Sequence, residues 1–219
     1  MVAIDNTFGA FPPAMVARPR PLAFALCGIA AALALASVAF VFHGGDRNGA
    51  RFAADMVMRF SSLAFIVFYI AGPLARLIPV RATAVLRLER LGLALTFVAI
   101  HGVFLASVAA EYFAMGTSMP LPAEAFCVFS AMILTALAIS SYNNTVVERP
   151  RVAWRALESL GCGYFWLIFA VSNLDYMVGP HRPDRFHGFV VFLLVVALLI
   201  RFADSFVQRH RFRLAEQAV

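Results

Sequence analysis

The chain has 219 residues, of which 62% are hydrophobic and 14% are charged, and its mean hydropathy is +0.83. These values exclude an ordinary soluble domain, which is about half apolar and about one quarter charged. The formal net charge of +6 would suggest a nucleic-acid partner in a soluble protein. In a chain this apolar the basic residues instead report membrane topology, so the expected partner is the lipid bilayer and not nucleic acid.

Apolar runs of about 20 residues, the length that crosses the hydrocarbon core of a bilayer, recur along the chain. The six runs are Leu22–Phe42, Met56–Ile78, Leu91–Phe113, Ala123–Ser141, Ala156–Val178 and Phe186–Asp204. The sequence therefore predicts an all-α fold, a polytopic membrane protein with one bundle of six transmembrane helices over residues 22–204. We expect a flexible, proline-rich arm over residues 1–21 and a basic tail over residues 205–219, both cytoplasmic.

The first run could be mistaken for a cleaved signal peptide. Arg18 and Arg20 precede it, and the segment from Ala34 to Ala36 resembles a cleavage site. Because the run is longer than a typical signal-peptide core, we expect an uncleaved membrane anchor. Ala30 and Ala34 have the small-x-x-x-small spacing that permits close helix contact, although an alanine-rich composition explains them equally well.

The arginines indicate the orientation, since all 18 basic residues are arginine. One side of the predicted bundle would hold Arg18, Arg20, Arg76, Arg81, Arg87, Arg90, Arg149, Arg151, Arg155, Arg201, Arg209, Arg211 and Arg213. The other side would hold only Arg47, Arg51, Arg59, Arg182 and Arg185. By the positive-inside rule, both termini are predicted to be cytoplasmic.

His101 lies in the middle of the third run, which otherwise has no ionisable residue before Glu111. A titratable ring at that depth usually faces a bundle interior, a polar partner or a cofactor. In the fifth run, Glu158 is expected to pair with Arg155 or with the pair Arg87 and Arg90, and a proton-handling role is the alternative. The polar residues that end the fourth run are expected to cap its helix: Ser140, Ser141, Tyr142, Asn143 and Asn144.

The remaining candidate residues give weaker indications of a functional site. Cys27, Cys127 and Cys162 lie inside predicted membrane segments without C-x-x-C spacing, so we interpret them as packing residues. Imidazoles and carboxylates near the ends of the runs offer the ligand types of a transition-metal site, although such loop residues more often contact water or headgroups. They are His43, Asp46, Asp55, Glu111, Asp175, His181, Asp184 and His187. No nucleotide-binding pattern or Ser-His-Asp order is found, so a redox activity would need electrons from a partner protein or quinol.

The order of several motifs resembles one known family. These motifs are Gly72-Pro-Leu-Ala-Arg-Leu at the end of the second run, Arg87-Leu-Glu-Arg-Leu-Gly-Leu93 before a run with a central histidine, Leu137-Ala-Ile-Ser-Ser-Tyr-Asn-Asn144, and Trp154-Arg-Ala-Leu157. Over about residues 55–175 the chain is similar to the ferric reductase-like transmembrane domain superfamily. That superfamily includes the haem-binding membrane subunit of the bacterial periplasmic methionine sulfoxide reductase system.

The resemblance implies a b-type haem protein of the bacterial inner membrane that transfers electrons across it. His101 matches the family's haem ligand on the third helix and is the candidate ligand of the haem iron. The fifth-helix pattern normally supplies two histidines, but Glu158 and Val171 stand in their places. A shift of one or two residues gives Ser172 or Asn173, and nothing places Met132 or Met177 opposite His101.

A b-type electron-transfer site needs two strong axial ligands. Two hypotheses therefore follow from the sequence. The chain is a divergent cytochrome that holds haem through His101 and an unusual second ligand, or it is a haem-free scaffold or assembly subunit of a larger membrane complex. A transporter is the weaker alternative, because transport sites usually show several intramembrane charges or interrupted helices in repeated halves.

Overall fold

The computed structural model describes residues 21–114, 116–146, 152–178 and 185–217. Within these ranges it has seven α-helices and no strand. They are α1 (Pro21–Phe42), α2 (Arg47–Leu77), α3 (Arg81–Leu88), α4 (Arg90–Ala114), α5 (Leu121–Val146), α6 (Val152–Val178) and α7 (Arg185–Gln217). All except α3 are long and apolar enough to cross a membrane, which confirms the six-helix prediction. The predicted N-terminal arm lies, apart from Pro21, outside the described residues.

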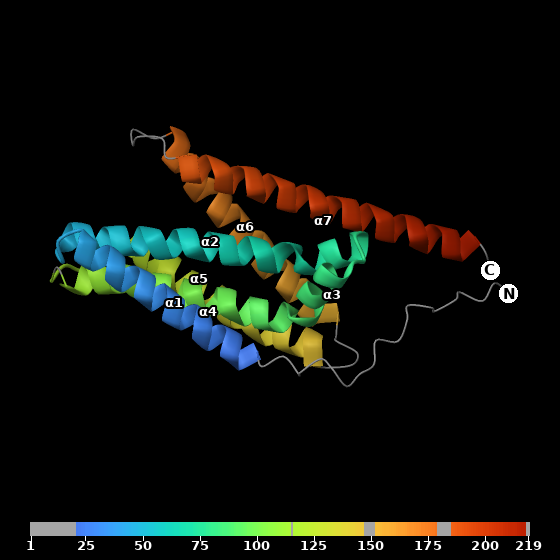
Figure 1. The fold of residues 1–219 in the computed structure, drawn as a ribbon, viewed down its shortest axis with the longest axis horizontal. Helices are drawn as coiled ribbons and strands as arrows, with labels where there is room; N and C mark the ends of the chain where they lie inside the picture. Colours follow the sequence, from blue (N-terminus) through green and yellow to red (C-terminus); the bar gives the residue numbers. More distant parts are fainter. Residues whose placement is uncertain (1–20, 115, 147–151, 179–184, 218–219) are drawn as a thin grey trace.

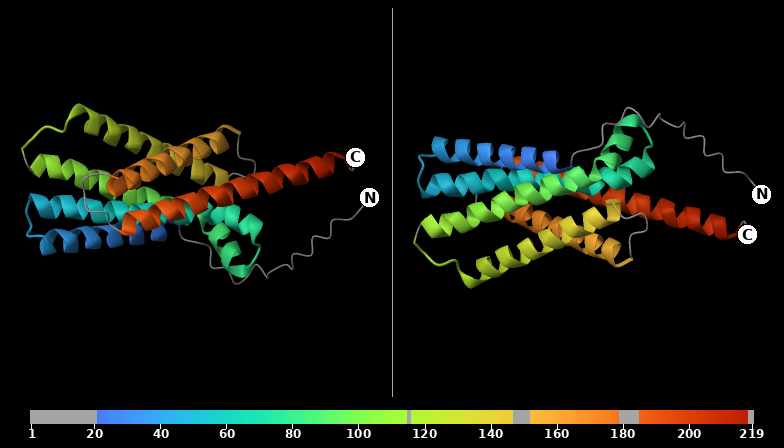
Figure 2. Two further views of the ribbon diagram at one scale, coloured as in Figure 1. Left: turned by 90° about the horizontal axis from the view of Figure 1, so that it is seen from above. Right: turned by 90° about the horizontal axis from the view of Figure 1, so that it is seen from below.

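The long helices run up and down along one another, with α2 and α4 at the centre (Figure 1). Helix α1 packs on α2 and α4, α5 packs between α4 and α6, and α7 packs on α2 and α6. We call the end at which α2 finishes, α4 begins and α7 finishes the arginine-rich end. Figure 2 shows α3 lying off the bundle axis at this end, while the α1–α2 and α4–α5 turns lie at the opposite end.

The tight turn between α1 and α2 depends on glycine and on one cap. Gly44 and Gly45 have φ angles of 95° and 67°, in the left-handed region that other residues adopt at a cost. Asp46 then caps α2, because its side chain accepts hydrogen bonds from the backbone N–H groups of Asn48 at 2.9 Å and Gly49 at 3.1 Å. The two helices therefore begin their contact directly at the turn.

Gly49 allows this close approach, and we expect Gly49→Ala to lower stability. A Cβ at position 49 would lie 2.7 Å from the backbone carbonyl oxygen of Phe40, which cannot move without shifting α1. Overpacking of this kind costs about 1–3 kcal/mol. Thermal unfolding in detergent measures the loss. Gly102→Ala is the control, since a Cβ there meets nothing within 4 Å, and equal stability of the two variants would contradict the expectation.

The end of α2 agrees in part with the sequence. Pro73 lies inside the helix, which continues to Leu77, and Pro79 follows its end. The six predicted runs left residues 79–90 without an element, whereas in the structure Arg81–Leu88 forms α3. The Thr83 hydroxyl accepts a hydrogen bond from the Val80 backbone N–H at 3.1 Å and so helps to start this helix. Its eight residues are too few and too polar to be recognised among membrane-length apolar runs.

Helix α1 uses small residues for packing, but not the pair expected from sequence. Gly28, Ala32 and Ala39 are buried, whereas Ala30 and Ala34 are exposed. A Cβ at Gly28 would come within 3.0 Å of the Thr96 side chain on α4, so the contact is close. Small residues occur all around this helix, and only the position of α4 selects which of them form the interface.

The interior of the bundle is rich in aromatic rings. Phe65 and Phe68 of α2, Phe97 of α4, and Phe165 and Phe169 of α6 are all almost fully buried. Several pairs of these rings have centroids between 5.1 and 6.4 Å apart, most of them tilted or edge-on and one, Phe68 with Phe97, stacked. The cysteines are unbonded thiols, of which Cys162 belongs to this core.

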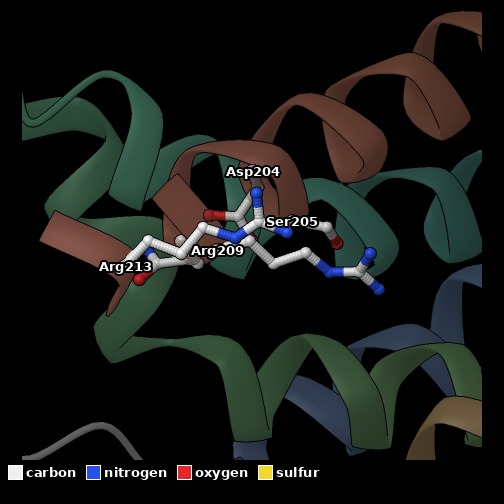
Figure 3. Close-up of a pocket in the computed structure, with 5 residues that line it drawn as sticks. Asp204, Ser205, Arg209 and Arg213 are labelled. Carbon is white, nitrogen blue, oxygen red and sulfur yellow. The ribbon is translucent and has the colours of Figure 1, made fainter. Parts of the chain in front are cut away.

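Helix α7 is longer than a membrane crossing requires. Its 33 residues span about 50 Å at 1.5 Å per residue, against about 30 Å of hydrocarbon. It continues through the predicted tail to Gln217, and Figure 1 shows its C-terminal part projecting past the other helices. A pocket of about 470 Å³ lies along this part, lined by Asp204, Ser205, Gln208, Arg209 and Arg213 (Figure 3).

Candidate functional site

His101 lies in the interior of the bundle, where its side chain is only 1% exposed. Its ring nitrogen Nδ1 shares a hydrogen bond of 2.9 Å with the hydroxyl of Ser61. Ser61 is itself fully buried on α2, so the bond joins the two central helices. The expected polar partner of His101 is therefore a serine, which the sequence did not identify.

Aromatic rings surround the rest of the imidazole. Phe97 and Phe104 lie on the same helix, with ring centroids 5.6 and 5.2 Å from that of His101. Phe165 and Phe169 approach from α6 at 5.0 and 5.6 Å, both edge-on. The second ring nitrogen, Nε2, is buried and has no hydrogen-bond partner among the described residues.

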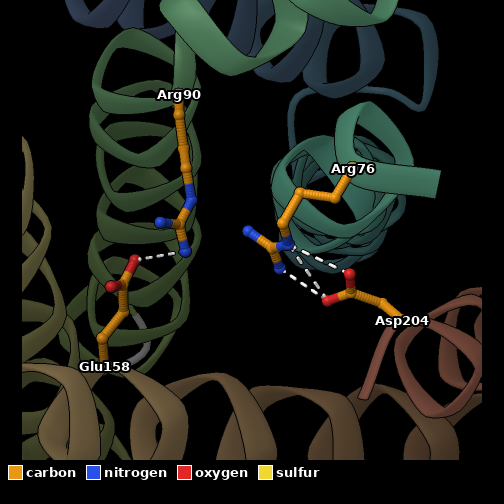
Figure 4. A network of polar contacts seen from close by, with 4 residues as sticks. All are labelled: Arg76, Arg90, Glu158 and Asp204. Atoms are coloured by element: carbon orange, nitrogen blue, oxygen red, sulfur yellow. Dashed lines mark hydrogen bonds and ion pairs between the residues drawn. The ribbon is translucent and has the colours of Figure 1, made fainter. Parts of the chain in front are cut away.

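Glu158, the first of the two α6 positions that the resemblance matches to histidine, is engaged in an ion pair. Glu158 is 5% exposed, and its Oε1 accepts hydrogen bonds from the Arg90 guanidinium at 2.9 Å and the Ser141 hydroxyl at 3.2 Å. Figure 4 shows Arg90 of α4 reaching toward this carboxylate. Of the two pairings expected for Glu158, the structure shows the one with the arginines around the start of α4, through Arg90. Ser141, expected to cap α5, donates to the same carboxylate.

The second α6 position that the resemblance matches to histidine is Val171, and its side chain lies away from His101. Val171 is 57% exposed on the outer surface of α6. Its neighbour Asn173 is buried, donates to the Phe169 carbonyl at 2.7 Å, and shares a 2.8 Å hydrogen bond with Nδ1 of His187 on α7. Met132 and Met177 are 58% and 41% exposed. None of these side chains faces His101.

The residues around His101 do not fit a haem held by two axial ligands. Phe165 and Phe169 fill the α6 side of the imidazole, and phenyl rings supply no donor atom for iron. At this site, the Nε2 atom of His101 has no hydrogen-bond partner among the described residues, and it is the one donor atom here that could bind a metal. The donor set is thus incomplete, and the space that a porphyrin would need beside His101 is occupied by side chains.

A further polar contact between helices was not expected from sequence. Arg76 of α2 binds Asp204 of α7 through both carboxylate oxygens, with Nε at 3.0 and 3.2 Å and Nη2 at 2.6 Å (Figure 4). Asp204 is 6% exposed. This pair joins α2 to α7, as Arg90–Glu158 joins α4 to α6 and Asn173–His187 joins α6 to α7. In both ion pairs the carboxylate is buried, whereas the Arg76 and Arg90 side chains are 40% and 30% exposed.

The metal hypothesis for the opposite end finds no support in the part of the chain that the structure describes. His43 stacks on Phe52 with ring centroids 3.6 Å apart, and His187 stacks on Tyr176 at 4.5 Å. No group of three His, Cys, Asp or Glu side chains gathers there among the described residues. His181 and Asp184 lie outside those residues.

Loss of the Ser61 hydroxyl should destabilise the bundle. Ser61→Ala removes the hydrogen-bond partner of Nδ1 and leaves a buried imidazole with neither nitrogen satisfied, which costs about 1–3 kcal/mol. Unfolding by denaturant in detergent measures the difference. Ser62→Ala is the matched control, because the Ser62 hydroxyl donates only to the Met58 carbonyl of its own helix. A Ser61→Ala protein as stable as that control would contradict the structural role of the bond.

The chain matches no protein-family model, no curated protein and no solved structure. What is established is a membrane-type bundle of six long apolar helices with one phenylalanine-enclosed histidine at its centre.

Proposed function

We propose that this protein is a haem-free member of the ferric reductase-like group that acts as a scaffold or assembly subunit of a larger membrane complex. One observation carries the proposal. Phenylalanine rings enclose the imidazole of His101, and Phe165 and Phe169 pack against it from α6, the helix from which a second iron ligand would come. His101 then acts as an interior polar contact to Ser61 rather than as an electron-transfer ligand.

The ion pair at position 158 supports the same proposal. Removing one partner of a buried pair is strongly unfavourable, so Arg90 makes Glu158 a structural residue and leaves it unsuited to bind metal. Together with Arg76–Asp204, it fixes the relative positions of α2, α4, α6 and α7. A rigid bundle of this kind suits a subunit whose outer surface binds other membrane proteins.

The test is a complex isolated from its native membrane in mild detergent through a tag on this chain. The proposal expects a defined complex larger than the chain alone, of the same size for His101→Phe, which replaces the imidazole by a ring of the type around it. Recovery of only the free chain, in mild detergent and after crosslinking in the membrane, would contradict the assembly role. A complex lost in His101→Phe, although that variant folds, would contradict the structural role of His101.

A cytochrome is the second candidate, and the unpartnered Nε2 of His101 is the observation that favours it. In metal sites, the other nitrogen of a ligating histidine is usually held by a hydrogen bond, as Ser61 holds Nδ1 here. Bound haem would supply one-electron transfer, with quinol or a partner protein as the electron source. This candidate requires Phe165 and Phe169 to move away from the imidazole, and it predicts haem that Ser61→Ala retains and His101→Phe loses.

We also propose that the arginine-rich end faces the cytoplasm of a bacterial cell, with both termini on the cytoplasmic side of the inner membrane. The arginine distribution supports this orientation through the positive-inside rule. A green fluorescent protein fused after Val219 should be fluorescent, because this reporter folds in the cytoplasm and not after export in an unfolded state. A C-terminal alkaline phosphatase fusion that is active instead would reverse the orientation.

A further inference from the structure

A polar cleft opens between α2, α6 and α7 near the arginine-rich end. It has a volume of about 380 Å³. Its lining combines polar groups with an apolar wall: Tyr69, Arg76, Ser159, Gly163, Leu198, Arg201, Phe202, Asp204 and Ser205. It shares Asp204 and Ser205 with the pocket along the projecting part of α7, which Figure 3 shows, so the two pockets adjoin and we treat them as one site.

This site has an excess of positive charge. Asp204 is the single acidic residue lining it, and its carboxylate is bound by Arg76 at 2.6 Å. The Arg201 guanidinium packs over the Tyr69 ring, 4.2 Å from its centroid, rather than against a carboxylate. Arg209 and Arg213 add two further charges beyond Asp204.

The helix sets these cations in a row. Arg201, Ser205, Arg209 and Arg213 follow one another at four-residue spacing, so each lies about 6 Å further along α7 and about 40° further around it than the one before. Arginine suits phosphate, because its planar guanidinium donates two parallel hydrogen bonds to phosphate oxygens. The Ser205 hydroxyl between two arginines adds a further donor.

The position of the site favours a lipid over a soluble anion. The apolar run of α7 ends at about Asp204, so Arg201 lies in its last turn, and Arg209 and Arg213 follow where the sequence becomes polar. Leu198, one turn before Arg201, and Phe202 form the apolar wall of the same cleft. A ligand that fits has an acidic phosphate on the outside and hydrocarbon on the inside.

We propose that this cleft binds the headgroup phosphate of an anionic phospholipid, with the first part of an acyl chain against Leu198 and Phe202. Basic pockets between membrane helices recognise anionic headgroups by this chemistry. The inference does not depend on whether His101 binds haem, because no cleft-lining residue is part of the His101 environment.

The experiment measures lipid binding to the purified chain in detergent by native mass spectrometry. Phosphatidylglycerol and phosphatidylcholine with identical acyl chains are compared, and inorganic phosphate is added in a separate arm. We expect phosphatidylglycerol to bind at least tenfold more tightly than phosphatidylcholine, and inorganic phosphate at the same concentration not to displace it. Equal affinity for the two lipids would overturn the proposal, and displacement by inorganic phosphate would assign the site to a soluble anion.

Three variants locate the site. Arg201→Gln and Arg209→Gln should each weaken phosphatidylglycerol binding about fivefold, since one interfacial arginine contributes about 1 kcal/mol. Gly163→Leu should weaken it as well, because a side chain there extends into open space that belongs to the cleft. Arg209 is exposed and does not support the core, so its variant remains informative even where Arg201→Gln fails to fold.

Matched control variants distinguish lipid binding in the cleft from attraction of the lipid by general surface charge. Arg155→Gln removes an exposed arginine from the same end of the bundle, and Gly102→Leu adds the same side chain at a glycine with equal free space. Both should bind phosphatidylglycerol as the unaltered chain does. A loss in Arg155→Gln equal to that in Arg209→Gln would show that net charge alone attracts the lipid, which contradicts a defined site.

Discussion

Phe165→Ala is expected to lower the free energy of unfolding by about 3–5 kcal/mol, the usual cost of emptying a fully enclosed phenylalanine site. Phe165 is 0% exposed, and its ring lies 5.1 Å from Phe97 and 5.0 Å from His101. In a membrane the loss comes mainly from dispersion contacts that lipid cannot restore inside the bundle. Unfolding by denaturant in mixed micelles measures it.

The control for this prediction is Phe192→Ala. Phe192 is 62% exposed on α7, where lipid already covers the ring, so its removal should change stability by less than about 0.5 kcal/mol. If both variants lose the same stability, Phe165 does not pack as described. The distinction matters for function, because a loosely packed Phe165 would leave the α6 side of His101 open to a cofactor.

The second large effect is expected at the Arg90–Glu158 pair. Arg90→Leu leaves the Glu158 carboxylate buried without its cation, which typically costs about 3–5 kcal/mol. Adding Glu158→Gln to that variant should recover most of the loss, since a neutral amide carries no uncompensated charge. Thermal unfolding of the single and double variants gives the coupling energy between the two side chains.

Arg155→Leu is the control for the Arg90 and Glu158 variants. Arg155 was the other candidate partner of Glu158, and it is exposed on α6. We expect a change within about 0.5 kcal/mol. A loss in Arg155→Leu as large as in Arg90→Leu would mean that Glu158 depends on both arginines, contrary to the ion pair in the structure.

Much of the fold could be predicted because membrane length is a strong constraint on sequence. Five of the six apolar runs lie entirely inside one long helix each. The remaining run, Met56–Ile78, extends one residue beyond the end of α2. Helix α3 could not be predicted in the same way, because its eight residues carry no membrane-length apolar run and depend on packing beside α2 and α4. The length of α7 was also underestimated, since its last turns are polar and continue the helix beyond the apolar segment.

The candidate site was predictable only in part. His101 stands out because an ionisable ring is rare in such a run, and Glu158 stands out for the same reason. Ser61 carries no such mark, since most serines in membrane helices bond to their own backbone, as Ser62 does. Which side chain of α2 faces His101 depends on the relative rotation of two helices, and nothing local in the sequence records it.

The cleft at the arginine-rich end also depends on contacts between helices that local sequence does not predict. Arg76 and Asp204 are 128 residues apart, and the sequence marked them only as a topology signal and as the end of an apolar run. Their contact follows from the packing of α2 against α7, which run in the same direction and both end at the arginine-rich end. The four-residue spacing from Arg201 to Arg213 was visible in the sequence, but its meaning required the knowledge that α7 continues as one helix.

The visible absorption spectrum of the detergent-purified protein, produced in cells supplied with a haem precursor and reduced with dithionite, decides whether His101 binds haem. We expect no Soret or α band, because Phe165 and Phe169 pack against His101 from α6, where haem and its second ligand would need space. Reduced Soret and α bands at about one haem per chain, lost in a folded His101→Phe variant, would contradict this expectation.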